Sequence, residues 1–243
     1  MRSTNRSHAR RTALQAAAFL VAATALLAPA QQPAPAPSAP PVVPSSPTSR
    51  FVVVLDAAHG GDDSGARIDS GSEKDVALAL SVKLRSLLAA RGFQVITTRE
   101  SDATLDAVHR AEIANRSGAQ ACLSLHATES GSGIHLFASS LTPAAPTRIP
   151  AWKTAQGGFV TRSLALAGVV NSALQHANIP VTVGRTALPG VDSMTCPAIA
   201  VEIAPLHPAN AAITSPADPA YQSQIAEALA AALLEWKTEA RQP

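Results

Sequence analysis

The chain of 243 residues carries 19 Lys and Arg against 17 Asp and Glu, so its formal net charge is only +2. Residues 1–30 contain four Arg and no acidic residue, which leaves 15 basic and 17 acidic residues and a net charge of −2 for the rest of the chain. A nucleic-acid-binding protein needs a clustered basic surface. We therefore expect no nucleic acid among the partners.

The first 49 residues have the composition of an export segment and a tether. Four Arg precede an apolar run over 13–28, and the small residues at 28–30 are typical of a cleavage site. We expect a signal peptide at 1–30, no stable membrane domain after its cleavage, and export to the periplasm or cell wall. An uncleaved membrane anchor is the alternative, although the run is shorter than the ~20 residues of a usual span. Residues 31–49 are rich in Pro and Ala, which indicates a disordered linker.

Residues 50–241 have the size of one ordinary domain, in which apolar runs alternate with segments of helical periodicity. In chain order, the expected elements are a strand at 51–55, a helix at 73–91, a strand at 93–98, a helix from the cap Ser101-Asp102 to Gly118, and strands at 119–126 and 133–138. They are followed by a helix at 159–176, an extended segment at 180–188, a turn at Pro189-Gly190, a strand at 196–203 and a helix at 219–239. Leu105 and Val108 are expected among the buried residues of the helix that ends at Gly118.

Strands that alternate with helices predict βαβ units. The expected fold class is therefore α/β, with one domain and a twisted, mostly parallel sheet that has helices on both faces. In such sheets, functional side chains gather where the strands end at their carboxyl termini.

Four side chains that bind metals or carry protons fall at this edge. His59 lies in the Gly-rich loop after the first strand, Glu73 opens the first long helix, and His126 and Glu202 stand at the ends of two apolar strands. Zinc prefers nitrogen and carboxylate ligands, and a catalytic zinc keeps one position for water, so two His and one Glu fit such a site. A further carboxylate has to carry the proton of that water, and Glu202 suits this role.

Each of these residues also has a simpler structural interpretation. His59 could make turn hydrogen bonds, Glu73 could be a first-turn helix acid, His126 a strand-end histidine, and Glu202 one half of a buried ion pair with Arg185. Their joint occurrence at one sheet edge favours the metal site.

Other polar residues are secondary candidates. Asp62 and Asp63 could orient His59, because a ligating imidazole usually donates its other N–H to a carboxylate. His135 is expected to be structural. Cys122 and Cys196 lie in or beside apolar runs, which favours buried free thiols, while an exported chain could also pair them.

Four stretches carry a resemblance to a known family; they read LDAAHGGDDSGA, GSEKDVALALSVKLRSLLAARGFQVITTRESD, RAEIANRSGAQACLSLHAT and CPAIAVEIA. In this order, from about residue 50 to the C-terminus, they resemble the zinc-dependent N-acetylmuramoyl-L-alanine amidases of bacterial cell walls. The resemblance implies a six-stranded sheet and hydrolysis of the amide between N-acetylmuramic acid and the L-alanine of peptidoglycan stem peptides. It also implies Zn²⁺ with the ligands His59, Glu73 and His126, and Glu202 as general base and acid on the zinc-bound water.

The chain departs from the family at positions beside the four site residues and keeps those residues themselves. It has Ala57-Ala58 in place of Pro-Gly, Thr128 in place of Asn, and Ala204-Pro205 in place of Gly-Phe. Peptidoglycan is the expected partner, and no oligomeric state is predicted. Two other functions stay open, namely a non-catalytic peptidoglycan-binding module of the same fold and a zinc peptidase that cuts within the stem peptide.

Overall fold

The computed structural model describes residues 50–145, 151–210 and 212–240. The expected signal peptide at 1–30 and linker at 31–49 lie outside these ranges. The elements are β1 (Val52–Ala57), β2 (Arg67–Ile68), β3 (Gly71–Ser72), α1 (Glu73–Ala90), β4 (Gln94–Thr97), α2 (Ala107–Ser117), β5 (Ala121–Ala127), β6 (Ile134–Ser139), the 3-10 helix η1 (Trp152–Gly158), α3 (Val160–His176), β7 (Val181–Thr186), α4 (Pro189–Asp192), β8 (Ala198–Ile203) and α5 (Pro219–Glu239).

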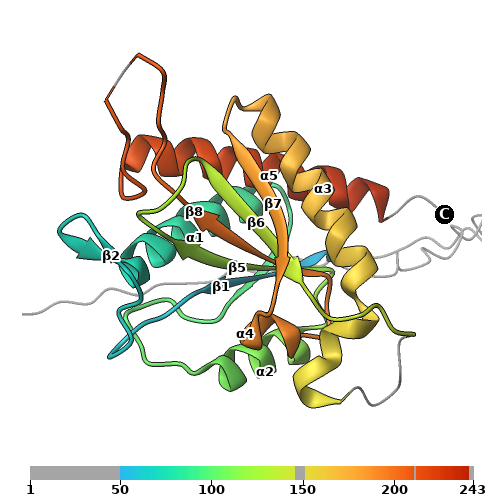
Figure 1. The fold of residues 1–243 in the computed structure, drawn as a ribbon. Coiled ribbons are helices and arrows are strands. Elements are labelled where there is room, and N and C mark those ends of the chain that lie inside the picture. The colour runs from blue at the N-terminus through green and yellow to red at the C-terminus, as the bar shows by residue number, and fades with distance from the viewer. Residues whose placement is uncertain (1–49, 146–150, 211, 241–243) are drawn as a thin grey trace, which may run out of the picture. The chain divides into compact units, whose positions relative to one another are not determined.

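A six-stranded sheet in the order β4-β1-β5-β8-β6-β7 forms the centre of the domain (Figure 1). The pairs from β4 to β8 are parallel, β6 pairs antiparallel with β8, and β7 is parallel to β6. The expected α/β class with a mostly parallel six-stranded sheet is therefore confirmed. The carboxyl ends of β1, β5 and β8 meet at one edge.

Helices cover both faces of this sheet. α1, α3 and α5 pack together on one face, and α2 and α4 lie on the other (Figure 1). All six residues of β1 are buried, as its continuous apolar run predicted, because both of its faces are covered. None of the helices in the described ranges has the length and apolar character needed to cross a bilayer.

Cys122 and Cys196 form a disulfide, with their Cα atoms 6.3 Å apart. The preference for free thiols is therefore wrong, although the apolar surroundings were predicted correctly. The two residues are 74 positions apart in the chain. They meet because β5 and β8 are neighbours in the sheet, with Cys122 N–H donating to the carbonyl of Pro197 at 2.8 Å.

The segment before α2 differs from its prediction. The helix begins at Ala107, and its cap is Asp106, whose Oδ1 accepts the N–H of His109 at 2.8 Å. Asp102 instead accepts hydrogen bonds from Gly61 N–H and Lys74 Nζ, so it ties the Gly-rich loop to α1. Val108, expected in the core, is 45% exposed.

Two smaller features also differ from the predicted elements. The loop before α1 contains the short antiparallel ribbon β2–β3, and the expected turn at Pro189-Gly190 is the start of the one-turn helix α4.

Candidate metal centre

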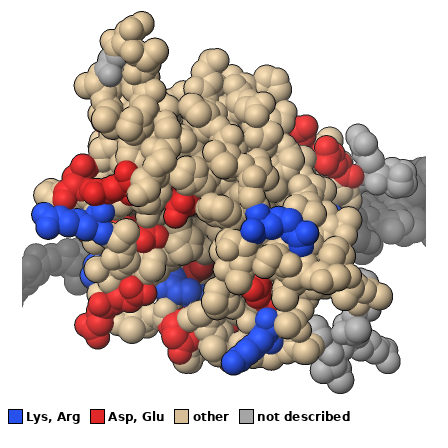
Figure 2. Space-filling model, in the orientation of Figure 1, with Lys and Arg blue, Asp and Glu red and all other residues tan. Residues whose placement is uncertain are grey.

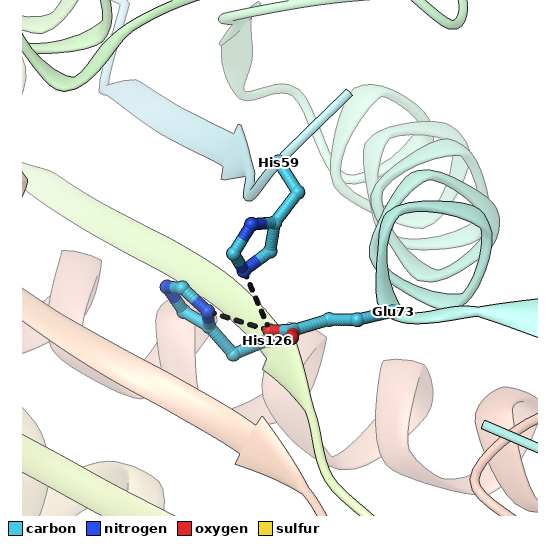
Figure 3. Close-up of side chains that lie close together, drawn as sticks. All are labelled: His59, Glu73 and His126. Atoms are coloured by element: carbon cyan, nitrogen blue, oxygen red, sulfur yellow. Dashed lines mark hydrogen bonds and ion pairs between the residues drawn. The ribbon is translucent and has the colours of Figure 1, made fainter. Parts of the chain in front are cut away.

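Three side chains from three elements converge at the carboxyl edge of β1 and β5 (Figure 3). His59 comes from the loop after β1, Glu73 is the first residue of α1, and His126 lies near the end of β5. Glu73 Oε1 lies 3.1 Å from His59 Nε2 and 2.8 Å from His126 Nδ1. One candidate ligand atom of each residue lies within 4.8 Å of the other two. The three predicted ligands, called the HEH cluster below, are therefore together in space.

The loop that carries His59 has a backbone conformation that most residues avoid. His59 has a φ of +60°, in the left-handed region, which costs a non-glycine residue about 1 kcal/mol. Its carbonyl oxygen accepts a hydrogen bond from the Arg110 guanidinium, which fixes the loop against α2. Gly65 makes room for the cluster, because a Cβ at this position would lie 2.7 Å from His59 Cδ2 and 2.6 Å from Glu73 Oε2.

Each imidazole of the HEH cluster has a partner on its outer nitrogen. His59 Nδ1 lies 2.8 Å from Asp63 Oδ2, and His126 Nε2 lies 3.3 Å from Ser124 Oγ. The Ser124 hydroxyl donates its only proton to Asp56 at 2.7 Å, so it can only accept from His126.

These outer partners determine how the two rings face Glu73. The Asp63 carboxylate, and the Ser124 hydroxyl whose proton is already donated to Asp56, can only accept a hydrogen bond. The outer nitrogens of both rings therefore carry N–H in the neutral state. The inner nitrogens face the carboxylate. A protonated ring donates to Glu73 through this nitrogen, and a neutral ring turns its lone pair toward the position where a cation would lie. Two imidazole lone pairs and a carboxylate that meet at one point fit a metal cation with nitrogen and oxygen ligands.

Glu73 is buried, yet it remains charged. Burial opposes its ionisation, but the hydrogen bonds from His126, His59 and the N–H of Ala66 outweigh burial and hold the pKa of this carboxyl well below its usual value. The hydrogen bond to Glu73, together with the weaker effect of Asp63, raises the pKa of His59 against the opposing effect of burial. The bond with His59 in turn lowers the pKa of Asp63. A carboxylate that stays ionised is available to a cation at neutral pH.

Glu202 lies beside the HEH cluster and is not part of it. On β8 it is the register partner of His126 on β5 and of His135 on β6. Paired residues on adjacent strands point to the same face, so the three side chains share one face of the sheet, with about 4.8 Å between neighbouring strands. Glu202 Oε2 lies 2.8 Å from His135 Nδ1.

The surroundings of Glu202 exclude one alternative considered for it and add one contact that was not predicted. Arg185 does not pair with Glu202, because its guanidinium donates to the carbonyl oxygens of Ser139 and Leu141. His135 is not part of the HEH cluster, which agrees with the expectation that it is structural, but its hydrogen bond with Glu202 was not predicted. The only signal in the sequence was a histidine within an apolar strand, and the contact depends on the antiparallel pairing of β6 with β8.

The buried ion pair of Asp56 and Arg110 contacts residues that position the HEH cluster. Asp56 at the end of β1 accepts hydrogen bonds from Thr98 Oγ1, Ser124 Oγ and Arg110 Nη1, at 2.7–2.8 Å. Arg110 also donates to the carbonyl oxygen of Ala57 at 2.6 Å. Asp56 and Arg110 thus link β1, β5 and α2 beneath the loop of His59. Arg110 therefore has a structural role.

A cavity of about 400 Å³ opens beside the cluster. His59 and His126 line it together with Asp63 and Arg110, and α2 and the segment around α4 supply apolar walls, among them Leu105, Leu188 and Val191. Figure 2 shows that charged side chains of both signs gather around the hollow in the lower half of this face, whereas its upper central part is uncharged. Because His59 and His126 are both partly exposed and line the cavity, a molecule in the cavity can contact the HEH cluster.

Comparison with known proteins relates this arrangement to one family. Residues 53–235 match the family described as N-acetylmuramoyl-L-alanine amidase. The N-acetylmuramoyl-L-alanine amidase AmiA of Escherichia coli is 40% identical over 94 residues, which are 37% of this chain and 32% of AmiA. The endolysin of Bacillus phage SPP1 is 39% identical over 89 residues, 35% of this chain and 33% of the endolysin. The chain thus spans about a third of the length of these curated relatives.

Solved structures match a larger part of the chain. The N-acetylmuramoyl-L-alanine amidase AmiC2 of Nostoc punctiforme is 28% identical, with a TM-score of 0.58, and the match covers 77% of this chain and 97% of AmiC2. The catalytic domain of the amidase CwlV from Bacillus (Paenibacillus) polymyxa shares the fold, with a TM-score of 0.59, 24% identity and coverage of 77% and 98%.

Proposed function

Because the chain belongs to the N-acetylmuramoyl-L-alanine amidase family, we propose that it is an exported zinc hydrolase that cleaves the amide between N-acetylmuramic acid and L-alanine in peptidoglycan. The observation that carries this proposal is the HEH cluster. Two imidazoles, each with an outer partner on its second nitrogen, turn toward one buried carboxylate oxygen. This donor set is typical of a catalytic zinc site.

Zinc would be held by His59 Nε2, His126 Nδ1 and the carboxylate of Glu73. When bound, it lowers the pKa of a water molecule and polarises the carbonyl group of the substrate. Asp63 and Ser124 keep the two imidazoles in the orientation and tautomer that ligation requires. The cavity beside the cluster admits the substrate on the side of α2.

Glu202 is the proton carrier of the proposed reaction. It accepts a proton from the attacking water and returns it to the leaving nitrogen of L-alanine. The N–H of His135 Nδ1 donates to Oε2 of this carboxylate and fixes its orientation. Because Glu202 adjoins His126 in the sheet, it lies next to the proposed ligands without being one of them.

The disulfide supports export. Disulfides persist in oxidising compartments and are rare in the cytosol. Cys122 and Cys196 are paired, which agrees with the signal peptide expected at residues 1–30. Peptidoglycan, the proposed substrate, is likewise found outside the cytoplasmic membrane, so we place the protein in the periplasm or cell wall.

Digestion of purified sacculi, with product identification by mass spectrometry, tests the proposal. The protein should release stem peptides with a free L-alanine amino group and leave the glycan intact. A chelator should abolish the release, and added zinc should restore it. Cleavage within the stem would instead identify a peptidase, and binding without release would identify a non-catalytic module. Either result would contradict the proposal.

A further inference from the structure

A second cavity lies next to the one beside the metal centre. It has a volume of about 290 Å³, and its lining residues come from α2, η1 and the region of α4: Ala107, Val108, Trp152, Lys153, Pro189, Asp192 and Ser193. Ala107 lines both cavities. α4 contributes Gly190 and Val191 to the first cavity and Pro189 and Asp192 to the second, so the two are adjacent.

The second cavity has an apolar wall that water reaches. Trp152 is 40% exposed and Val108 is 45% exposed, whereas the other tryptophan, Trp236, is 4% exposed and packs in the core. An accessible indole offers a large, rigid surface that is apolar on its faces and polar at its N–H. Such a surface suits a ligand with one apolar face and polar edges.

Asp192, which lines the second cavity, carries an unsatisfied acceptor. Asp192 is only 8% exposed, and its Oδ2 accepts the N–H of Leu188 at 3.0 Å. Its Oδ1 is buried and has no hydrogen-bond partner among the residues that the structure describes. Buried polar atoms without a partner are rare, because their desolvation is not compensated. A ligand that brings an O–H or N–H donor would satisfy this oxygen.

We propose that this cavity binds an N-acetylated sugar of the glycan strand, next to the sugar whose amide is cleaved. A sugar ring presents a C–H face to Trp152 and a hydroxyl or acetamido N–H to Asp192 Oδ1. The carboxylate at the end of a stem peptide would meet both Lys153 and Asp192, so charge gives it no advantage, whereas a sugar ring can use Trp152 and Asp192 together. The inference rests on the proposed function, since it takes the glycan to extend from the cavity beside the HEH cluster.

A binding titration tests the site without requiring hydrolysis. The zinc-loaded full chain is titrated with the tetramer of N-acetylglucosamine, and tryptophan emission is recorded. The emission should change on binding, the change should persist in Trp236→Phe, and it should disappear in Trp152→Phe. No binding of the tetramer, or a signal that comes from Trp236, would overturn the proposal. A free stem peptide that perturbs Trp152 while the sugar does not would show that the cavity is a peptide site.

Asp192→Asn provides the matched variant. The Asn oxygen can still accept the N–H of Leu188, but an NH₂ group replaces the acceptor that faces the ligand. Calorimetry should show affinity for the tetramer reduced about tenfold, as expected when a buried acceptor loses its donor. Leu164→Ala, at an exposed position on α3, should bind as the wild type does. Unchanged affinity of Asp192→Asn would contradict the role of Oδ1.

Kinetics with two substrates connect the site to hydrolysis. For an oligosaccharide that carries a stem peptide, Trp152→Ala should raise KM about tenfold, the loss expected for one aromatic contact, and leave kcat unchanged. For N-acetylmuramoyl-peptide with a single sugar, KM should not change. Equal effects on both substrates would overturn the glycan assignment. If the wild type hydrolyses neither substrate, the proposed function fails, and the binding titration still decides whether the cavity takes sugar.

Discussion

Glu202 and the residues of the HEH cluster have different contacts, which fit two different proposed roles, proton transfer for Glu202 and metal ligation for the cluster. His59 and His126 face Glu73 with one nitrogen and an outer partner with the other. Glu202 instead contacts His135 and stands one strand away from His126. Ligand residues should therefore control metal content, whereas Glu202 should control turnover.

Glu202→Gln tests this separation, because glutamine keeps the size of the side chain and cannot take up the proton. We expect kcat to fall at least about 100-fold, the usual scale for loss of a general base, at an unchanged zinc-to-protein ratio. His126→Ala should lose zinc, as measured by elemental analysis. Wild-type turnover in Glu202→Gln, or full zinc content in His126→Ala, would show that the roles are assigned incorrectly.

His135 is a positioning residue for Glu202 in the same account. His135→Phe keeps the ring size and removes the donor, so kcat should fall about tenfold, the scale of a lost hydrogen bond to a charged group, with KM unchanged. His135→Asn places an N–H close to the position of Nδ1 and should recover most of kcat. If Phe and Asn have the same effect, the hydrogen bond at 2.8 Å has no part in turnover.

At the scale of elements, α2 holds the loop of His59 against the sheet. Arg110 on this helix is buried and pairs with the buried Asp56 of β1, and it also donates to the carbonyl oxygens of Ala57 and His59. Arg116, six residues further along the same helix, pairs with Glu112 on the surface. The same helix thus carries one arginine in a buried ion pair and another in an exposed ion pair.

Arg110→Ala should destabilise the protein by about 3–5 kcal/mol, because it leaves the Asp56 carboxylate buried without its counter-charge. Arg116→Ala should cost less than about 1 kcal/mol, as exposed ion pairs usually do. Urea unfolding followed by circular dichroism measures both values. Similar losses in the two variants would mean that the pair with Asp56 does not stabilise the loop.

The sequence predicted the elements better than the contacts between them. Continuous apolar runs identified β1, β5 and β8, and the spacing of apolar residues identified α1, α3 and α5, because these patterns are local. The position of His59, Glu73 and His126 at one edge followed from the rule that parallel strands share their carboxyl end.

Contacts that depend on strand order were not predictable in this way. The disulfide between Cys122 and Cys196 requires that β5 and β8 are neighbours, and the contact of His135 with Glu202 requires that β6 runs antiparallel to β8. The start of α2 was missed because Asp102 and Asp106 are both good helix caps in sequence, and tertiary contacts with Lys74 and Gly61 take up the first.

At the scale of the whole molecule, the disulfide joins β5, which carries His126, to the residues just before β8, which carries Glu202. Replacement of both cysteines by Ala should lower the stability by about 2–4 kcal/mol, the usual contribution of a disulfide. The thermal midpoint of the variant, compared with that of the wild type with and without reductant, measures this loss. Thiol labelling of the unfolded, unreduced protein should find no free cysteine. Two labelled thiols would contradict the pairing.

The central claim is that residues from three separate elements hold one zinc ion. A crystal structure of the zinc-loaded protein, with anomalous data collected on both sides of the zinc absorption edge, tests it most directly. We expect one anomalous peak about 2.0–2.2 Å from His59 Nε2, His126 Nδ1 and a carboxylate oxygen of Glu73. A zinc peak with other ligands, or no peak at the HEH cluster in protein crystallised with zinc, would contradict the account.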